Sequence, residues 1–174
     1  MANPTMTLIG SPVVVGSGGA SSIDFTSIPS TYTDLCVKFS LRCATAGAIQ
    51  QVYIRFNSNS GSVYSNIRLF GYSNAAGSTS ASSSSSASIN WTSGSSATAN
   101  TFGSGELYIP NYASSNNKSF SAELVSENNS ATDAVTGMTA GLFASTTAIS
   151  AVNIIGESNF VQYSTAYLYG ISNS

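Results

Sequence analysis

Two glutamates are the residues in this chain that most resemble a catalytic pair. Glu106 and Glu123 fall on the polar faces of consecutive segments with alternating hydrophobicity. A pair of facing carboxylates hydrolyses glycosides when the groups lie about 5 Å apart, or about 6.5–9.5 Å apart in inverting enzymes. Nothing in the spacing of these two residues favours that chemistry, and acids of this kind more often pair with arginine. We therefore predict no catalytic residue and a protein that is not an enzyme.

Histidine is absent from the chain, which excludes Ser–His–Asp and Cys–His arrangements. The two cysteines, Cys36 and Cys43, cannot complete a four-ligand zinc site without carboxylates, so we predict no metal and no cofactor. Their odd spacing on one alternating strand points the thiols to opposite faces, about 23 Å apart. A disulfide needs Cα atoms within about 7 Å, so we expect two free thiols, buried or half-buried.

Three arginines have a regular spacing. Arg42, Arg55 and Arg68 recur every thirteen residues, each opposite the aliphatic row of its segment. If their strands are neighbours, they form a row on one sheet face. Two interpretations remain open: ion pairs with Glu106 and Glu123, each contributing about 0–1 kcal/mol, or contacts between subunits. We therefore name the three arginines as candidate interface residues.

Alternation with a period of two residues dominates the elements that would position these side chains, and no helical period extends beyond about two turns. The pattern predicts roughly eight to ten short strands separated by Gly, Ser, Asn and Pro turns. Together they indicate one all-β domain over residues 1–174, a two-sheet antiparallel sandwich of jelly-roll type. The alternating segments are 5–15, 35–42, 50–57, 65–73, 105–110, 118–126, 136–144, 149–158 and 164–172.

A low-complexity segment, residues 73–100, is rich in Ser, Ala, Gly and Thr and is predicted to be a flexible loop. It contains Trp91, the only tryptophan, which either plugs the edge of the sandwich and tethers the loop or is an exposed anchor for a neighbouring subunit or ligand. A shorter loop is predicted over residues 111–119. Both loops are expected at the ends of the sandwich, where contact loops collect, so we add Trp91 and Tyr112 to the candidate interface.

Charge is scarce throughout the chain. Charged residues make up 7% of it, against about 25% in an average soluble domain, and the net charge is −2. Without a basic patch we expect no binding to nucleic acid, and without a long apolar run we expect no membrane span. The first ten residues lack the basic and apolar regions of a signal peptide, so we expect synthesis in the cytoplasm. Low charge suits dense assembly.

One stretch, "SSIDFTSIPSTYTDLCVKFSLR", resembles a segment of small virion structural proteins of tailed bacteriophages, which include capsid decoration, cement and tail-fibre-associated proteins. The closing "AYLYGISNS" resembles the last strand of such proteins. Within the stretch, Pro29, Tyr32 and Asp34 are expected to build a rigid turn, in which Pro29 fixes its own φ and Asp34 caps the turn. The matching positions are Ile23, Phe25, Ile28, Pro29, Tyr32, Asp34, Leu35 and Arg42.

The resemblance implies a non-enzymatic structural protein located in the virion. The leading hypothesis is a capsid decoration or cement protein, a homo-oligomer that bridges shell subunits and has the major capsid protein as its partner. The alternative is a tail-fibre or tail-tip module that binds host surface glycan, with Trp91 and tyrosines as stacking platforms. The lack of a coiled-coil or shaft repeat favours the head.

Overall fold

The structure is a computed structural model that describes residues 5–129 and 132–172. Within these residues the chain forms strands and no helix. None of them therefore belongs to a helix that could cross a membrane. The nine-stranded sheet contains, in spatial order, β1 (Met6–Leu8), β13 (Thr165–Ile171), β4 (Asp34–Leu41), β9 (Gly103–Ile109), β10 (Lys118–Ser126), β11 (Val135–Phe143), β6 (Tyr64–Tyr72) and β7 (Ala75–Ser84), with β2 (Val13–Val14) also paired to β13. The four-stranded sheet contains β3 (Ala20–Phe25), β12 (Val152–Phe160), β5 (Ile49–Phe56) and β8 (Ala87–Ser93).

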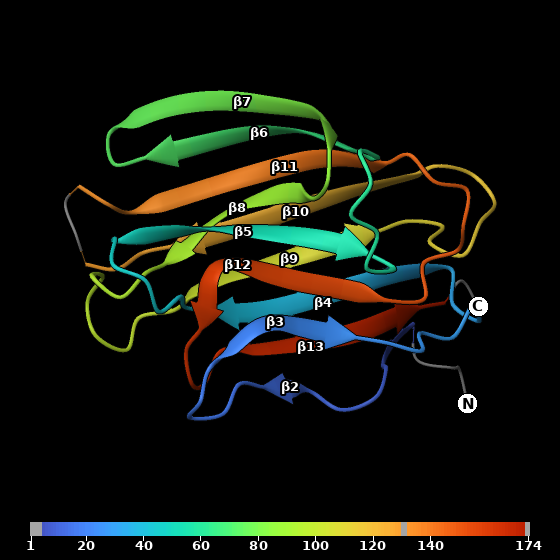
Figure 1. The fold of residues 1–174 in the computed structure, drawn as a ribbon, viewed down its shortest axis with the longest axis horizontal. Helices are drawn as coiled ribbons and strands as arrows, with labels where there is room; N and C mark the ends of the chain where they lie inside the picture. Colours follow the sequence, from blue (N-terminus) through green and yellow to red (C-terminus); the bar gives the residue numbers. More distant parts are fainter. Residues whose placement is uncertain (1–4, 130–131, 173–174) are drawn as a thin grey trace.

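The two sheets pack face to face as a sandwich, and every pair of neighbouring strands is antiparallel (Figure 1). This confirms the predicted all-β fold class. The described residues form thirteen strands rather than eight to ten. The predicted segment 5–15 contains two very short strands, β1 and β2, instead of one, and the Ser-rich segment contains two strands that were not predicted.

Aromatic rings fill one part of the space between the sheets. The ring centroid of Phe56, on the small sheet, lies 5.5 Å from that of Phe120 and 5.4 Å from that of Phe143, both on the large sheet. Tyr64 stacks on Phe143 at 5.1 Å and donates its hydroxyl to the carbonyl oxygen of Asn59. Edge-on and offset ring pairs of this kind add to the burial of apolar area, so this cluster locks the two sheets together.

The chain crosses repeatedly from one sheet to the other. Strand β4 lies in the large sheet, β5 in the small sheet and β6 in the large sheet again. Successive segments that look alike in sequence are therefore not neighbours in space. Because of this crossing, residues at regular spacing on successive strands, such as the three arginines, do not line up on one sheet face.

The predicted rigid turn is a corner that takes the chain from β3 in the small sheet to β4 in the large one. The backbone N–H of Ile28 donates to Ser150, and the carbonyl of Pro29 accepts from the Tyr112 hydroxyl. The ring of Tyr32 lies so close to Gly170 that a Cβ there would be 2.3 Å from it. The corner is thus held by the loop before β12, by the loop after β9 and by β13 of the large sheet.

Asp34 has a different role from the predicted turn cap. Its carboxylate accepts the Tyr108 hydroxyl at 2.6 Å and the backbone N–H of Asn111 at 2.8 Å. The hydrogen bond to Asp34 raises the pKa of Tyr108 to about 12. Asp34 therefore joins β4 to β9 and to the loop that follows β9.

The prediction of a Ser-rich loop over residues 73–100 was wrong for most of that segment. Residues 75–84 form β7, which pairs along its length with β6, and residues 87–93 form β8, which pairs with β5. Low-complexity composition does not indicate which backbone segments pair with one another. Here the partner strands β6 and β5 supply the backbone hydrogen bonds that make the segment extended. A true loop remains only between β8 and β9.

Strand β7 lies at an edge of the large sheet, beyond the last strand of the small sheet (Figure 1). Nearly all of its side chains are exposed. The β6–β7 hairpin therefore overhangs the sandwich, and the side of it that faces the small sheet forms one wall of a cleft.

Candidate functional site

Arg42 is a buried clamp rather than a surface contact. Its side chain is 8% exposed, and burial lowers the pKa of the guanidinium. It holds the loop between β8 and β9 by donating to four carbonyl oxygens, those of Ser95, Ala97, Thr98 and Thr101, over 2.8–3.3 Å. In the isolated chain these bonds occupy the guanidinium, which corrects its assignment to an interface.

The three arginines do not form a row. Because the chain crosses between the sheets, Arg55 lies on β5 of the small sheet and Arg68 on β6 of the large sheet. Arg55 donates from Nε to the carbonyl oxygen of Ser85 at 3.0 Å. The cation that pairs with Glu106 is Lys38 rather than an arginine.

Tyr112 is also an interior side chain. It is fully buried, and its hydroxyl donates to Pro29. Its place in a polar loop sequence suggested exposure, but the ring reaches back into the sandwich. In the described chain it is therefore a core residue and not a surface contact.

Both cysteines are free and buried. Cys43 belongs to the core, whereas Cys36 lies on the outer side of the large sheet between Tyr108 and Tyr169 of the neighbouring strands. Burial and the nearby Glu106 carboxylate raise the pKa of Cys36 to about 12, and burial raises the pKa of Cys43 to about 11. The prediction of opposite orientations and free thiols agrees with this arrangement.

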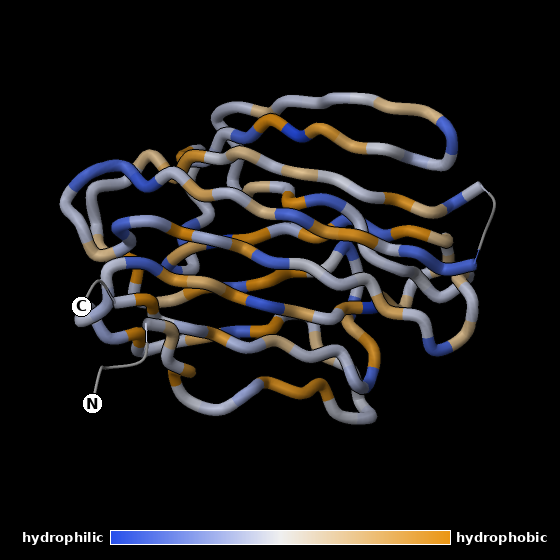
Figure 2. Tube along the Cα trace, turned by 180° about the vertical axis from the view of Figure 1, so that it is seen from behind, coloured by the Kyte–Doolittle hydropathy of each residue, from blue (hydrophilic) through white to orange (hydrophobic). Residues whose placement is uncertain are grey.

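The first candidate surface is an exposed apolar area on the outside of the large sheet. We call it the apolar outer face and define it as Ile67, Leu69, Val125, Met138 and Leu142. The last three lie on β10 and β11 and the first two on β6, with Leu69 directly opposite Met138. Met138 is 66% exposed, Leu69 61% and Ile67 53%. Figure 2, which views the molecule from behind, shows hydrophobic positions alternating with polar ones along the strands.

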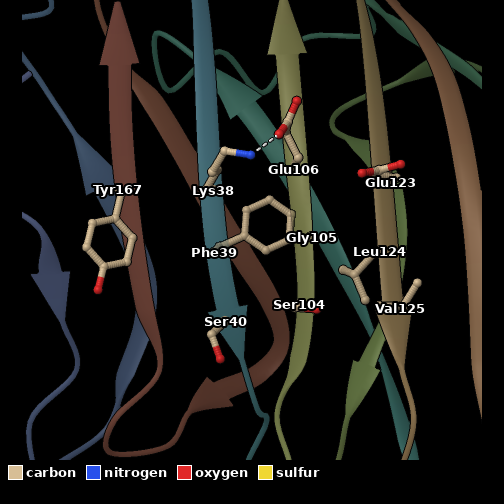
Figure 3. A pocket seen from close by; sticks show the side chains of 10 residues that line it. All are labelled: Lys38, Phe39, Ser40, Ser104, Gly105, Glu106, Glu123, Leu124, Val125 and Tyr167. Atoms are coloured by element: carbon tan, nitrogen blue, oxygen red, sulfur yellow. Dashed lines mark hydrogen bonds and ion pairs between the residues drawn. The ribbon is translucent and has the colours of Figure 1, made fainter. Parts of the chain in front are cut away.

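A hollow of about 440 Å³ adjoins the apolar outer face on β4, β9 and β10. Figure 3 shows Lys38 pointing to Glu106, Glu123 on the next strand and Tyr167 on the other side. Glu106 and Glu123 are direct cross-strand partners, as the sequence allowed. The hydrogen bond to Glu106 raises the pKa of Lys38. In the described chain the Glu106 carboxylate is therefore paired with Lys38 rather than with an arginine.

The second candidate surface is a cleft of about 460 Å³ between the overhanging β6–β7 hairpin and the outer side of β5 and β8. We call it the polar cleft. Its wall on the hairpin includes Asn66 and Arg68, and its wall on the small sheet includes Gln51 and Tyr53. The remaining lining residues are small, being Ala81, Thr79, Ser80, Ser84, Ser85, Ser86 and Ser88.

Arg68 is the central side chain of the polar cleft, and it is 8% exposed. Its Nε donates to Thr79 Oγ1 at 3.2 Å. With the Gln51 amide oriented by its hydrogen-bond partners, the amide oxygen accepts from Nη1 at 2.7 Å and from Nη2 at 3.2 Å. Burial lowers the pKa of Arg68.

Trp91 lies on β8 beside the polar cleft and is half-buried. The guanidinium carbon of Arg68 lies 4.5 Å above the centre of its ring, and the Phe70 ring meets it edge-on with centroids 4.9 Å apart. These contacts fasten the overhanging hairpin to the small sheet. Of the two interpretations of Trp91, the tether describes its contacts in the isolated chain.

Sequence reasoning missed both candidate surfaces. The outer-face apolar residues were missed because Ile67 and Leu69 alternate with Asn66 and Arg68, and period two then predicts that the aliphatic row faces the interior, whereas the structure exposes it. The polar cleft had no sequence signal, because it depends on the pairing of β6 with β7. Among the described residues, no group of three or more His, Cys, Asp or Glu side chains is placed to hold a metal ion.

Comparisons with known proteins identify no family for this chain. No protein-family model and no curated protein matches it. Among solved structures, the galectin LEC-6 of Caenorhabditis elegans aligns over 99% of each chain with 8% identity and a TM-score of 0.27. The carbohydrate-binding module CBM66 from Bacillus subtilis aligns over 97% of this chain and 94% of its own, with 8% identity and a TM-score of 0.21. Likeness at this level carries no argument about function.

Proposed function

We propose that this protein is a non-enzymatic structural subunit of a bacteriophage virion, a decoration or cement protein that binds the capsid shell through its apolar outer face. The observation that carries the proposal is the exposure of Ile67, Leu69 and Met138 together on one sheet face. Contiguous apolar area of this kind marks interaction surfaces on soluble proteins. The resemblance of residues 21–42 to phage virion proteins supports the setting.

The partner in this proposal is the major capsid protein, and bridging of adjacent shell subunits stabilises the head. A small homo-oligomer on the shell surface suits the scarcity of charge, because dense copies repel each other little. The Lys38–Glu106 pair and Glu123 form a polar border beside the apolar residues. Such a border around an apolar centre is the usual anatomy of a protein interface.

The test uses particles that lack this protein, to which purified protein is added back. A Leu69→Ser, Met138→Ser double variant removes apolar contacts at exposed positions, so the fold is retained. We expect its affinity for bare heads to fall at least about 30-fold, the equivalent of about 2 kcal/mol at a buried hot spot. Val14→Ser, which changes another exposed apolar side chain on a different part of the surface, is the matched control.

Unchanged binding of the double variant would show that the apolar outer face is not the surface that binds the capsid shell. Bare heads that withstand heat as well as decorated heads would remove the cement role. Copy number, read from a quantitative gel of purified virions, separates head from tail: a decoration protein is present in amounts comparable with the major capsid protein.

A second candidate function is recognition of host glycan by a tail-fibre or tail-tip module. The specific observation in its favour is the polar cleft, whose hydroxyl and amide groups suit sugar hydroxyls. Loss of host adsorption by virions lacking this protein, with head stability unaffected, would favour it.

A further inference from the structure

The polar cleft contains a buried cation without a carboxylate partner. The acceptors recorded for Arg68 are Thr79 Oγ1 and the Gln51 amide oxygen, both neutral. Buried charges are ordinarily paired, because an unpaired ion loses its hydration without compensation. This side chain therefore retains the capacity to attract an anion into the cleft.

The guanidinium also has donors to spare. Arginine carries five N–H groups in a fixed fork. Thr79 and Gln51 take three of them in the described part of the chain, one from each guanidinium nitrogen. Two remain for another acceptor, and a guanidinium matches the geometry of a carboxylate.

Other charges near the cleft do not cancel this preference. Arg55 lies at its rim and is joined to the lining residue Ser85. The carboxylate in this neighbourhood is Glu157, which accepts the backbone N–H of Gln51 at 3.0 Å and does not line the cleft. Burial and the charge of Glu157 raise the pKa of Tyr53, so its phenol remains a neutral hydrogen-bonding group at neutral pH.

The rest of the lining suits a polyhydroxylated ligand. Serine and threonine residues of β7 and the turn after it line the cleft together with Asn66 on the hairpin wall, and Tyr53 lies on the opposite wall. The volume of about 460 Å³ accommodates a sugar unit together with its substituents. A free aromatic platform is missing from this design, because Arg68 already covers the Trp91 ring.

We propose that the polar cleft binds a carboxylated sugar, whose carboxylate contacts Arg68 and whose hydroxyls contact the serine-rich wall. The inference rests on the second candidate function and names its ligand class. It is independent of whether the apolar outer face binds a capsid.

The test is a binding titration of the full-length protein, followed by NMR, with methyl β-D-glucuronide and the α-methyl glycoside of N-acetylneuraminic acid. The matched neutral probe is methyl β-D-glucoside, and acetate is the carboxylate without a sugar. We expect at least one acidic sugar to bind about tenfold or more tightly than the glucoside and than acetate.

Two variants locate the site. Arg68→Gln should abolish the preference for the acidic sugar. Because Arg68 also packs on Trp91, thermal unfolding of this variant is measured alongside, and Ser85→Trp provides an independent block at an exposed lining position. Lys38→Gln, which removes one positive charge on the outside of the large sheet, should leave binding unchanged.

Four results would overturn the proposal. Equal binding of acidic and neutral sugars would show that the cleft does not recognise the carboxylate, although the protein would still recognise glycan. Acetate binding as tightly as the acidic sugars removes the sugar. No binding of any sugar at about 10 mM removes the site and the second candidate function with it. Full binding by both cleft variants removes the polar cleft as the site but leaves glycan recognition elsewhere on the protein standing.

Discussion

At the scale of single residues, the arginines of this chain are used inside the molecule. Arg42 and Arg68 are both buried, and neutral oxygens rather than carboxylates surround them. A planar guanidinium with five donors can hold several backbone carbonyls at once, which lysine cannot do with the same geometry. Arg42 therefore supplies hydrogen bonds to the carbonyl oxygens of the β8–β9 loop, as neighbouring strands do for one another elsewhere in the fold.

Replacing Arg42 should be costly. Arg42→Gln leaves four buried or partly buried carbonyl oxygens without this donor, and we expect the free energy of unfolding to fall by about 3 kcal/mol. The midpoint of urea denaturation measures this. Arg55→Gln, which removes a single hydrogen bond at a half-buried site, is the control and should cost less than about 1 kcal/mol. Equal losses in both variants would contradict the clamp.

The thiols predict a pH dependence of stability. In the folded protein their pKa values are raised from 9.0 to about 12 for Cys36 and about 11 for Cys43. The unfolded chain therefore loses these protons first as the pH rises, so the stabilisation is complete below pH 9.0 and is lost toward pH 12. A Cys36→Ala, Cys43→Ala variant should lose less stability over this window in urea titrations, although Tyr108 keeps a contribution of the same sign.

The same burial makes the thiols unreactive. Iodoacetamide at neutral pH should leave the intact mass of the native protein unchanged, and should add two groups after denaturation, because only the exposed thiolate reacts. A mass lower by two hydrogens that is restored by reductant would reveal a disulfide and refute the assignment.

At the scale of the elements, the Ser-rich segment contains two strands with opposite environments. Strand β8 is almost completely buried and pairs with β5, whereas β7 is exposed and pairs on one side with β6. Its other edge pairs with no strand of the described residues. The long edge contains no charge and no proline, the devices that ordinarily protect sheet edges.

Hydrogen exchange should separate the two strands. In the free protein we expect slow exchange across β8 and fast exchange across β7, because an edge strand with little burial opens at low free-energy cost. In the proposed assembly on the capsid, slower exchange in β7 would show that a neighbour covers it. Equally strong protection of β7 in the free protein would refute the expected mobility.

Period-two alternation was sufficient to predict the sandwich, because residues such as Val37, Phe39 and Leu41 must share one buried face. It could not predict which strands share a sheet, since that depends on crossings such as β4 to β5 to β6. The prediction that the three arginines form a row was wrong for this reason. The predicted exposure of Tyr112 was wrong because a polar loop sequence does not reveal a ring that turns inward. The polar cleft could not be predicted because it depends on the pairing of β6 with β7, which the sequence did not indicate.

At the scale of the whole molecule, the proposed docking depends on apolar contact. Exposed charge pairs such as Lys38–Glu106 contribute little to binding, whereas buried apolar side chains dominate. Affinity for bare heads should therefore change less than about threefold over a tenfold range of salt. The measurement is the add-back titration at several salt concentrations. A steep fall in affinity with salt would point to a charged interface and against the apolar outer face.

The burial of the two thiols has a consequence for the electrical behaviour of any particle that carries many copies. Histidine is the side chain whose ordinary pKa lies between about 5 and 8, and the chain has none. Thiols titrate next, and burial moves theirs to about 12 and about 11. The side chains in a coat of this protein consequently keep a nearly constant charge, and its electrophoretic mobility should stay nearly level from mildly acidic to mildly alkaline surroundings, where thiols at their ordinary pKa of 9.0 would begin to ionise.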